Sequence, residues 1–303
     1  MMKTRMRKLG LLTAVFALAL FLYSAPAKAK PLVLGSGANS LFYTNVENWI
    51  DKDGSGDIST NDILYGIFNV QNISNGGSDI WGMDNVGGDG TLHTLTGYFL
   101  TTVTGVNVHG GLGGDVHISL GAATADPNGV LTAADLSSGV VLKMFEDDTS
   151  VGGPGTAYTT NDAGGAAGDI ANATDGSVWA TLNIGPNGYW YTHAPVVPPT
   201  NAGEAIGESW FGLDFVINNT GKSFLAIDDP LESEAGAGGI ALVEMYGTSN
   251  INANNPGITG GDNWDFMSQD PAVVVTPEPG TLLLLGSGLL GGALLRRRRA
   301  RKS

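Results

Sequence analysis

The sequence predicts a mainly β fold, a β-sandwich or jelly roll with glycine-rich loops. Short runs of β-branched and aromatic residues recur along the chain, and several alternate between apolar and polar positions. Glycine makes up 46 of the 303 residues and gathers between those runs. No long pattern with the period of a helix separates them, which favours an all-β body over an α/β one.

The predicted strands follow one another from residue 98 to residue 246. They cover residues 98–103, 116–120, 140–145, 178–184, 189–191, 210–217, 223–227 and 240–246. Gly185-Pro186-Asn187-Gly188 is a turn sequence, so residues 178–184 and 189–191 are expected to pair as a hairpin. Residues 130–136 are expected to form a single helical turn.

The first 29 residues have the three parts of a secretory signal peptide. A basic segment comes first, the apolar residues 11–22 follow, and Ala27 and Ala29 supply the small residues of a cleavage site. We expect this segment to form a signal helix, to engage the secretion translocon and to be removed.

The last 27 residues carry a second targeting signal. They begin with Pro277, Glu278 and Pro279, followed by an apolar run over residues 281–295. The basic cluster that ends the chain starts with Arg296, Arg297, Arg298 and Arg299. A hydrophobic helix over the apolar run would be roughly 22 Å long, shorter than the ~30 Å hydrocarbon core of a bilayer. Its basic end is expected to stay in the cytoplasm, which puts the body on the outer side.

This tail resembles that of the PEP-CTERM family, in which it is a sorting signal. The resemblance rests on Pro277-Glu278-Pro279 and on the hydrophobic and basic parts that follow. It implies that a membrane protease of the exosortase type cuts the chain near this motif. The body would then pass from a transient membrane anchor to the cell surface or to an exopolysaccharide matrix. A permanent C-terminal anchor is the alternative.

Basic and acidic residues are separated along the chain. Six of the 15 Lys and Arg lie at or before Lys30 and six lie at or after Arg296, whereas all 29 Asp and Glu lie between these ends. Residues 31–280 therefore combine three basic with 29 acidic side chains, a formal charge of −26. Such a surface repels phosphate backbones, which argues against nucleic acid as a partner. The chain has no cysteine, so disulfides and thiol catalysis are excluded.

Residues 51–62 fit the spacing of a 12-residue calcium-binding loop. The ligand positions are taken by Asp51, Asp53, Ser55, Asp57, Ser59 and Asp62. Gly56 falls where such a loop turns sharply, and Asp57 would offer its backbone carbonyl. The segment resembles a loop of the EF-hand or dockerin type, which implies a structural Ca²⁺ as cofactor. Asp62 and Ser55 depart from the usual Glu and Asp at their positions, and an acidic turn without metal is the alternative. The flanks of the loop permit either helices or strands.

Four histidines, His93, His109, His117 and His193, lie far apart in the sequence. None belongs to a metal-binding spacing such as H-E-x-x-H, so we expect ordinary strand or loop positions for them.

The expected organisation has four parts. They are the signal peptide (1–29), the β-sandwich body (30–251), a polar tether (252–276) and the sorting signal (277–303). The functional prediction is a non-enzymatic, exported surface or exopolysaccharide-matrix protein. One alternative is an extracellular carbohydrate-binding module that uses the aromatic cluster near Trp190. The other is a secreted polysaccharide hydrolase, whose two carboxylates cannot be picked out among 29 acidic residues.

Overall fold

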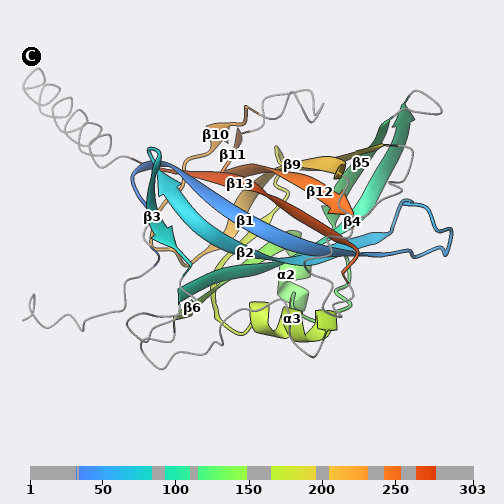
Figure 1. The fold of residues 1–303 in the computed structure, drawn as a ribbon, viewed down its shortest axis with the longest axis horizontal. Helices are drawn as coiled ribbons and strands as arrows, with labels where there is room; N and C mark the ends of the chain where they lie inside the picture. Colours follow the sequence, from blue (N-terminus) through green and yellow to red (C-terminus); the bar gives the residue numbers. More distant parts are fainter. Residues whose placement is uncertain are drawn as a thin grey trace, which may run out of the picture. The chain divides into compact units, whose positions relative to one another are not determined.

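Antiparallel strands make up most of the computed structural model (Figure 1). The structure describes residues 32, 34–83, 93–109, 115–148, 165–195, 205–230, 242–253 and 264–277. All of them belong to one unit, Leu32–Ser303. The predicted signal helix, the hydrophobic helix 281–295 and the basic end lie outside the described residues, and so do Glu278 and Pro279.

The described elements follow the chain from residue 37 to residue 276. The strands are β1 (Gly37–Ile50), β2 (Ile63–Asn75), β3 (Ser78–Gly82), β4 (His93–His109), β5 (Asp115–Ala122), β6 (Val140–Asp148), β7 (Ser177–Asn183), β8 (Tyr189–Pro195), β9 (Ala205–Asn218), β10 (Ile227–Asp228), β11 (Leu242–Val243), β12 (Met245–Ala253) and β13 (Phe266–Thr276). The helices are α2 (Ala133–Ser137) and α3 (Gly165–Ala173). Helix α2 confirms the predicted helical turn, and Thr132 and Asp135 begin it with a capping box. Among the described residues, no helix combines the length and apolar character needed to cross a membrane.

The main sheet closes on itself as an eight-stranded barrel, so the predicted sandwich or jelly roll is wrong. Its order is β3-β2-β1-β13-β12-β9-β7-β6-β4-β5-β8, and the pairings of β2 with β4 and of β9 with β8 complete the ring. Chain neighbours are sheet neighbours through most of the ring, as in an up-and-down barrel. Because a closed sheet has no free edge, the long strands find partners on both sides without a second sheet.

The main sheet contains more strands than the eight places in the barrel ring, because some places are shared by two strands that follow each other end to end. The first half of β4 pairs with β6 and its second half with β5, so β5 and β6 follow each other along one side of β4. In the same way, β7 and β8 pair with successive parts of β9. The predicted hairpin between residues 178–184 and 189–191 is therefore wrong, because β7 and β8 continue in one direction.

Two glycines let the chain break between β7 and β8 while it stays against β9. A Cβ added at Gly185 would lie 1.9 Å from an oxygen of Asp214, and one at Gly188 would lie 2.7 Å from the carbonyl oxygen of Gly212. Only glycine fits so close to a neighbouring strand. The Gly-Pro-Asn-Gly signal was correctly identified as a turn, but this turn interrupts a strand position instead of reversing the chain.

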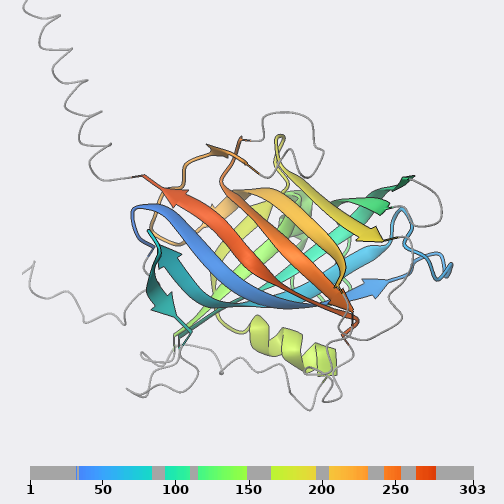
Figure 2. The same cartoon turned by 45° about the horizontal axis from the view of Figure 1, so that its top comes forward.

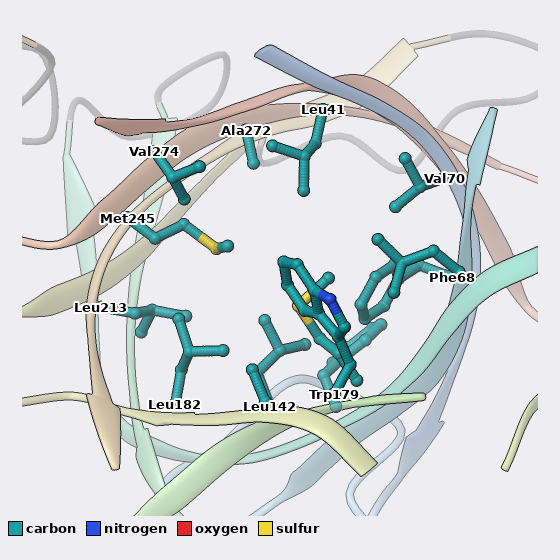
Figure 3. Packing of buried hydrophobic residues seen from close by; sticks show 14 of the residues in the cluster. Leu41, Phe68, Val70, Leu142, Trp179, Leu182, Leu213, Met245, Ala272 and Val274 are labelled. Carbon is teal, nitrogen blue, oxygen red and sulfur yellow. The ribbon is translucent and has the colours of Figure 1, made fainter. Parts of the chain in front are cut away.

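The barrel encloses an apolar core to which every part of the ring contributes. Figure 3 shows side chains from opposite walls pointing inward, among them Leu41, Phe68, Leu213, Met245 and Val274. A second core lies outside the wall, where Ile170 and Ala173 of α3 pack with Ile67 and Tyr98. Helix α3 covers this outer side of the barrel in Figure 2.

The predicted polar tether needs correction, because residues 266–276 form β13 inside the barrel wall. This strand pairs with β1 along its whole length and with β12 on its other side. Pro271 made this strand hard to predict from the sequence, because proline has no N–H to donate and is rare within central strands. The pairing of β12 with β13 is interrupted there, between Ala272 and Gln269.

Candidate functional sites

The acidic loop Asp51–Asp62 connects β1 to β2, so its flanks are strands (Figure 1). Asp51 organises its first half. One oxygen of the Asp51 carboxylate accepts hydrogen bonds from the N–H groups of Asp53 and Gly54, and the other accepts one from Gly56, at 2.7 Å. Gly54 and Gly56 have positive φ values of 72° and 80°, which turn their N–H groups toward Asp51 without strain.

The middle of the acidic loop is held by serine hydroxyls. The Asp53 carboxylate accepts hydrogen bonds from the Ser55 N–H at 2.9 Å and from the Ser59 hydroxyl at 3.0 Å. Hydrogen bonds from Ser55, followed by those from Ser59, lower the pKa of the exposed Asp53. The Ser55 hydroxyl donates to the carbonyl oxygen of Asp57 at 2.9 Å. Ser55, Asp57 and Ser59 are therefore bonded within the loop.

Asp62 closes the acidic loop from a fully buried position. One carboxylate oxygen accepts a hydrogen bond from the Lys52 N–H at 2.9 Å. The other accepts bonds from the Ser59 N–H at 2.7 Å and from the Trp49 indole at 3.1 Å. A carboxylate has about four lone-pair positions, so these three donors leave room for one further ligand. Asp62 can therefore bind a metal through a single oxygen, not through two as the usual Glu does.

Three of the predicted ligands converge in the acidic loop. Asp51, Asp53 and Asp62 each place one oxygen within 4.8 Å of the others. Oxygens that share one Ca²⁺ at about 2.3–2.6 Å lie at most roughly 5 Å apart, so this spacing fits such an ion. The loop thus has the oxygen chemistry and the spacing of a Ca²⁺ site, with carboxylates from three of the six predicted residues.

Glu47 of β1 lies inside the barrel and was not singled out in the sequence. Its carboxylate accepts a hydrogen bond from the Asn45 amide at 2.5 Å, and the Ser268 hydroxyl lies 2.6 Å from the same oxygen. The Ser249 hydroxyl in turn donates to Ser268, at 2.6 Å. Burial raises the pKa of Glu47, and these hydrogen bonds only partly oppose it. The interior is therefore a polar network set into an apolar core.

Two cavities meet at Glu47. One, of about 50 Å³, is lined mainly by apolar side chains of the barrel core, including Leu41, Phe99 and Trp190. The other, of about 70 Å³, lies toward Trp49 and Phe266 and shares Glu47 with the first. Each has room for water beside the carboxylate. No pattern in the sequence indicates this site, because its residues come from strands at both ends of the chain.

The predicted aromatic cluster near Trp190 is divided between the two faces of the wall. Trp190 points inward and packs against Phe99 and Phe211, with ring centroids 5.7 and 5.3 Å away. Tyr191 is partly buried on the outer face, where it packs in one cluster with Trp210 and Tyr246. We call Tyr191, Trp210 and Tyr246 the outer aromatic cluster; it is the aromatic surface that the wall presents beside β9.

The comparisons with known proteins bear on the end of the chain. A family described as the PEP-CTERM protein-sorting motif matches residues 275–299. Neither the curated proteins nor the solved structures include a significant match to this chain. The matched segment begins within β13, which ends at Thr276. The chain therefore carries a PEP-CTERM sorting motif, the mark of an exported protein that is sorted to the surface through its C-terminal segment.

Proposed function

We propose that this chain is a non-enzymatic protein of the cell surface or of an exopolysaccharide matrix, released from the membrane by an exosortase-type protease. The PEP-CTERM motif over residues 275–299 carries the proposal. The formal charge of −26 over residues 31–280 suits a hydrated, cation-rich matrix. The barrel is the part that is exported, and the described strands of its wall are paired on both sides around the ring, which protects most strand edges from aggregation outside the cell.

The end of β13 supports cleavage in the motif. Thr276 is the last residue of the strand, and its hydroxyl donates to the carbonyl oxygen of Gly35 at 2.5 Å. The Pro277-Glu278-Pro279 motif follows immediately. A cut near Pro279 would therefore remove the hydrophobic and basic parts and leave every strand of the barrel in place.

Mass spectrometry of the protein from the surface fraction tests this proposal. We expect a C-terminus near Pro279, and we expect a variant with Pro277, Glu278 and Pro279 replaced by Ala to keep its tail and remain in the membrane fraction. Replacement of Asn252 by Ala, outside the motif, is the control and should leave processing unchanged. A surface protein that still ends in Arg296 to Lys302 would overturn the proposal and favour a permanent anchor.

We further propose that the acidic loop holds a structural Ca²⁺ through Asp51, Asp53 and Asp62. Support comes from the 12-residue spacing and from the convergence of three carboxylate oxygens within 4.8 Å. Extracellular loops of this kind bind Ca²⁺ with a Kd of roughly 10⁻⁴–10⁻³ M, a level suited to the exterior of the cell.

The outer aromatic cluster favours a second candidate function, an extracellular carbohydrate-binding module. Tyr191, Trp210 and Tyr246 lie together on one face of the wall, and Tyr189 beneath them donates to the Asp229 carboxylate at 2.6 Å. Aromatic rings flanked by carboxylates are a surface on which sugars can stack. A glycan array separates the two functions, because a module would bind a defined glycan and would lose it on Trp210→Ala. Binding to no glycan leaves the matrix protein as the function.

A further inference from the structure

Two histidines that are 76 residues apart in the sequence lie side by side in the barrel wall. His117 belongs to β5 and His193 to β8, and the two are direct partners in the register of this antiparallel pair. Cross-strand partners have Cβ atoms about 4.5–5.5 Å apart, so their side chains meet on the same face. This pairing could not be predicted from the sequence, because neither histidine belongs to a metal-binding spacing.

The pleat puts this pair on the outer face of the wall. The next residues in register, Thr192 of β8 and Ser209 of β9, point inward and are joined by a hydrogen bond of 3.1 Å between their hydroxyls. Successive residues of a strand point to opposite faces, so His193 points outward. Both imidazoles are partly buried, and the ring of Trp210 packs edge-on against His193, with centroids 5.6 Å apart.

The two rings present the same atom to each other. The Nε2 atoms of His117 and His193 are in contact, and the rings meet edge to face with an interplanar angle of 74°. Facing imidazole nitrogens share one position between them, which a proton or a metal ion can take. Two Zn–N bonds of about 2.0–2.1 Å in tetrahedral geometry place the nitrogens roughly 3.3 Å apart, a separation that small side-chain rotations reach.

We propose that His117 and His193 form a binding site for a transition-metal ion of the Zn²⁺ class on the outer wall of the barrel. Imidazole is a ligand for Zn²⁺, Ni²⁺ and Cu²⁺, whereas Ca²⁺ prefers oxygen ligands. This site is therefore distinct in chemistry and in place from the acidic loop. The metal joins β5 to β8, the two strand segments that complete the wall between β4 and β9.

Glu208 is the candidate third ligand. It is the register partner of His193 on β9, so the residues His117, His193 and Glu208 form one row across three strands. Its side chain is exposed, and it stands on the same outer face of the wall as the pair. Two histidines, one carboxylate and a water complete a tetrahedral Zn²⁺ site.

The test is calorimetric titration of the full-length chain with Zn²⁺ in mild detergent. The chain is purified without a polyhistidine tag, and excess Ca²⁺ occupies oxygen-ligand sites such as the acidic loop. We expect one saturable Zn²⁺ site per chain. His117→Ala and His193→Ala should each weaken binding by about tenfold or more, and Glu208→Gln should weaken it less. His93→Ala is the matched control, since it removes a histidine of β4 that is not part of the pair and should leave the affinity unchanged.

Nitrogen NMR of ¹⁵N-histidine-labelled wild type gives a second measurement that does not depend on the variants folding. Zn²⁺ should shift the Nε2 resonances of two of the four histidines and leave the other two in place. Circular dichroism in EDTA establishes that each variant is folded before its titration is compared. The proposal is overturned if the wild type binds no Zn²⁺, if both variants of the pair bind it like wild type, or if the shifted pair survives in His117→Ala.

Discussion

The acidic loop and the barrel interior hold carboxylates in opposite ways, although Glu47 and Asp51 are four residues apart on the same stretch of chain. Asp51 and Asp53 are held by N–H and hydroxyl groups from residues within five or six positions, and water reaches them. Glu47 is held by Ser268, 221 residues away, in a place where its charge is desolvated. Local hydrogen bonds therefore lower the pKa of Asp53, while burial in the barrel raises the pKa of Glu47.

Asp147 on β6 is also buried, but on the outer side of the wall, because its partner Thr94 alternates with Leu95, which faces the barrel core. It is 1% exposed, and among the described residues one of its oxygens has no hydrogen-bond partner, while the other accepts from the Thr94 hydroxyl at 2.8 Å. Burial raises its pKa to about 6, and repulsion from Asp175 and Glu146 adds to the shift. Asp62 combines features of both kinds of carboxylate. It is as buried as Glu47, but its hydrogen-bond donors are nearby in the sequence, as they are for Asp51.

The largest expected loss of stability follows from replacing Asp62, which is buried like Glu47 but hydrogen-bonded by nearby residues like Asp51. Asp62→Ala should lower the free energy of unfolding by about 3–5 kcal/mol in EDTA, because it leaves three N–H donors without their acceptor. Urea denaturation of the full-length chain in detergent measures the loss. Asp57→Ala is the control: its side chain is exposed and should change stability by less than about 0.5 kcal/mol. Equal, small losses of stability in both variants would mean that the buried hydrogen bonds of Asp62 do not stabilise the fold.

The next largest effect is stabilisation by Ca²⁺, which should depend on the acidic loop and not on the barrel interior. At a free Ca²⁺ concentration of about 100 times Kd, the wild type should gain about 2.7 kcal/mol, visible as a higher Tm. Asp51→Ala should abolish the gain, whereas Glu47→Gln removes a carboxylate of the preceding strand, β1, and should keep it. Mg²⁺ at equal ionic strength is the control for charge screening, since it demands a smaller octahedral site. Equal stabilisation by the two ions would withdraw the calcium site.

The smallest expected effect is the pH dependence of stability that comes from the buried carboxylates Asp147 and Glu47. Because the pKa of Asp147 rises from 3.8 to about 6 on folding, the folded state holds a proton that the unfolded state releases between these values. Stability should therefore fall as pH rises from about 4 to about 6, and the loss should persist at neutral pH. Asp147→Asn should flatten this slope and stabilise the protein at pH 7 by roughly 1–3 kcal/mol. Glu47→Gln should act in the same direction.

Denaturation curves of wild type and Asp147→Asn across that pH range provide the measurement. Asp53→Asn is the comparison from the acidic loop. Its pKa is lowered by hydrogen bonds, so ionised Asp53 stabilises the fold above its ordinary pKa and the contribution is lost as pH falls. If the contributions of Asp147 and Asp53 to stability changed in the same direction with pH, the distinction between buried and loop carboxylates would be contradicted.

What the sequence determined by itself is local. The acidic loop is one contiguous stretch whose glycines and carboxylates set their own geometry, so its spacing could be read directly, and the structure brings Asp51, Asp53 and Asp62 together. The sorting motif is likewise contiguous, and the family match over residues 275–299 confirms it. The alternation and clustering of β-branched and apolar residues predicted strands correctly, as β5, β6 and β7 illustrate, because side-chain period is a property of each segment.

Only the tertiary structure decided which segments meet. Strand alternation is the same in a sandwich and in a barrel, so the closure of β2 on β4 was invisible in the sequence. The interruption at Pro271 hid β13, and the turn at Gly185 suggested a hairpin where the wall continues. Glu47 with Ser268 and His117 with His193 are joined by register between distant strands, and register depends on the packing of the whole ring.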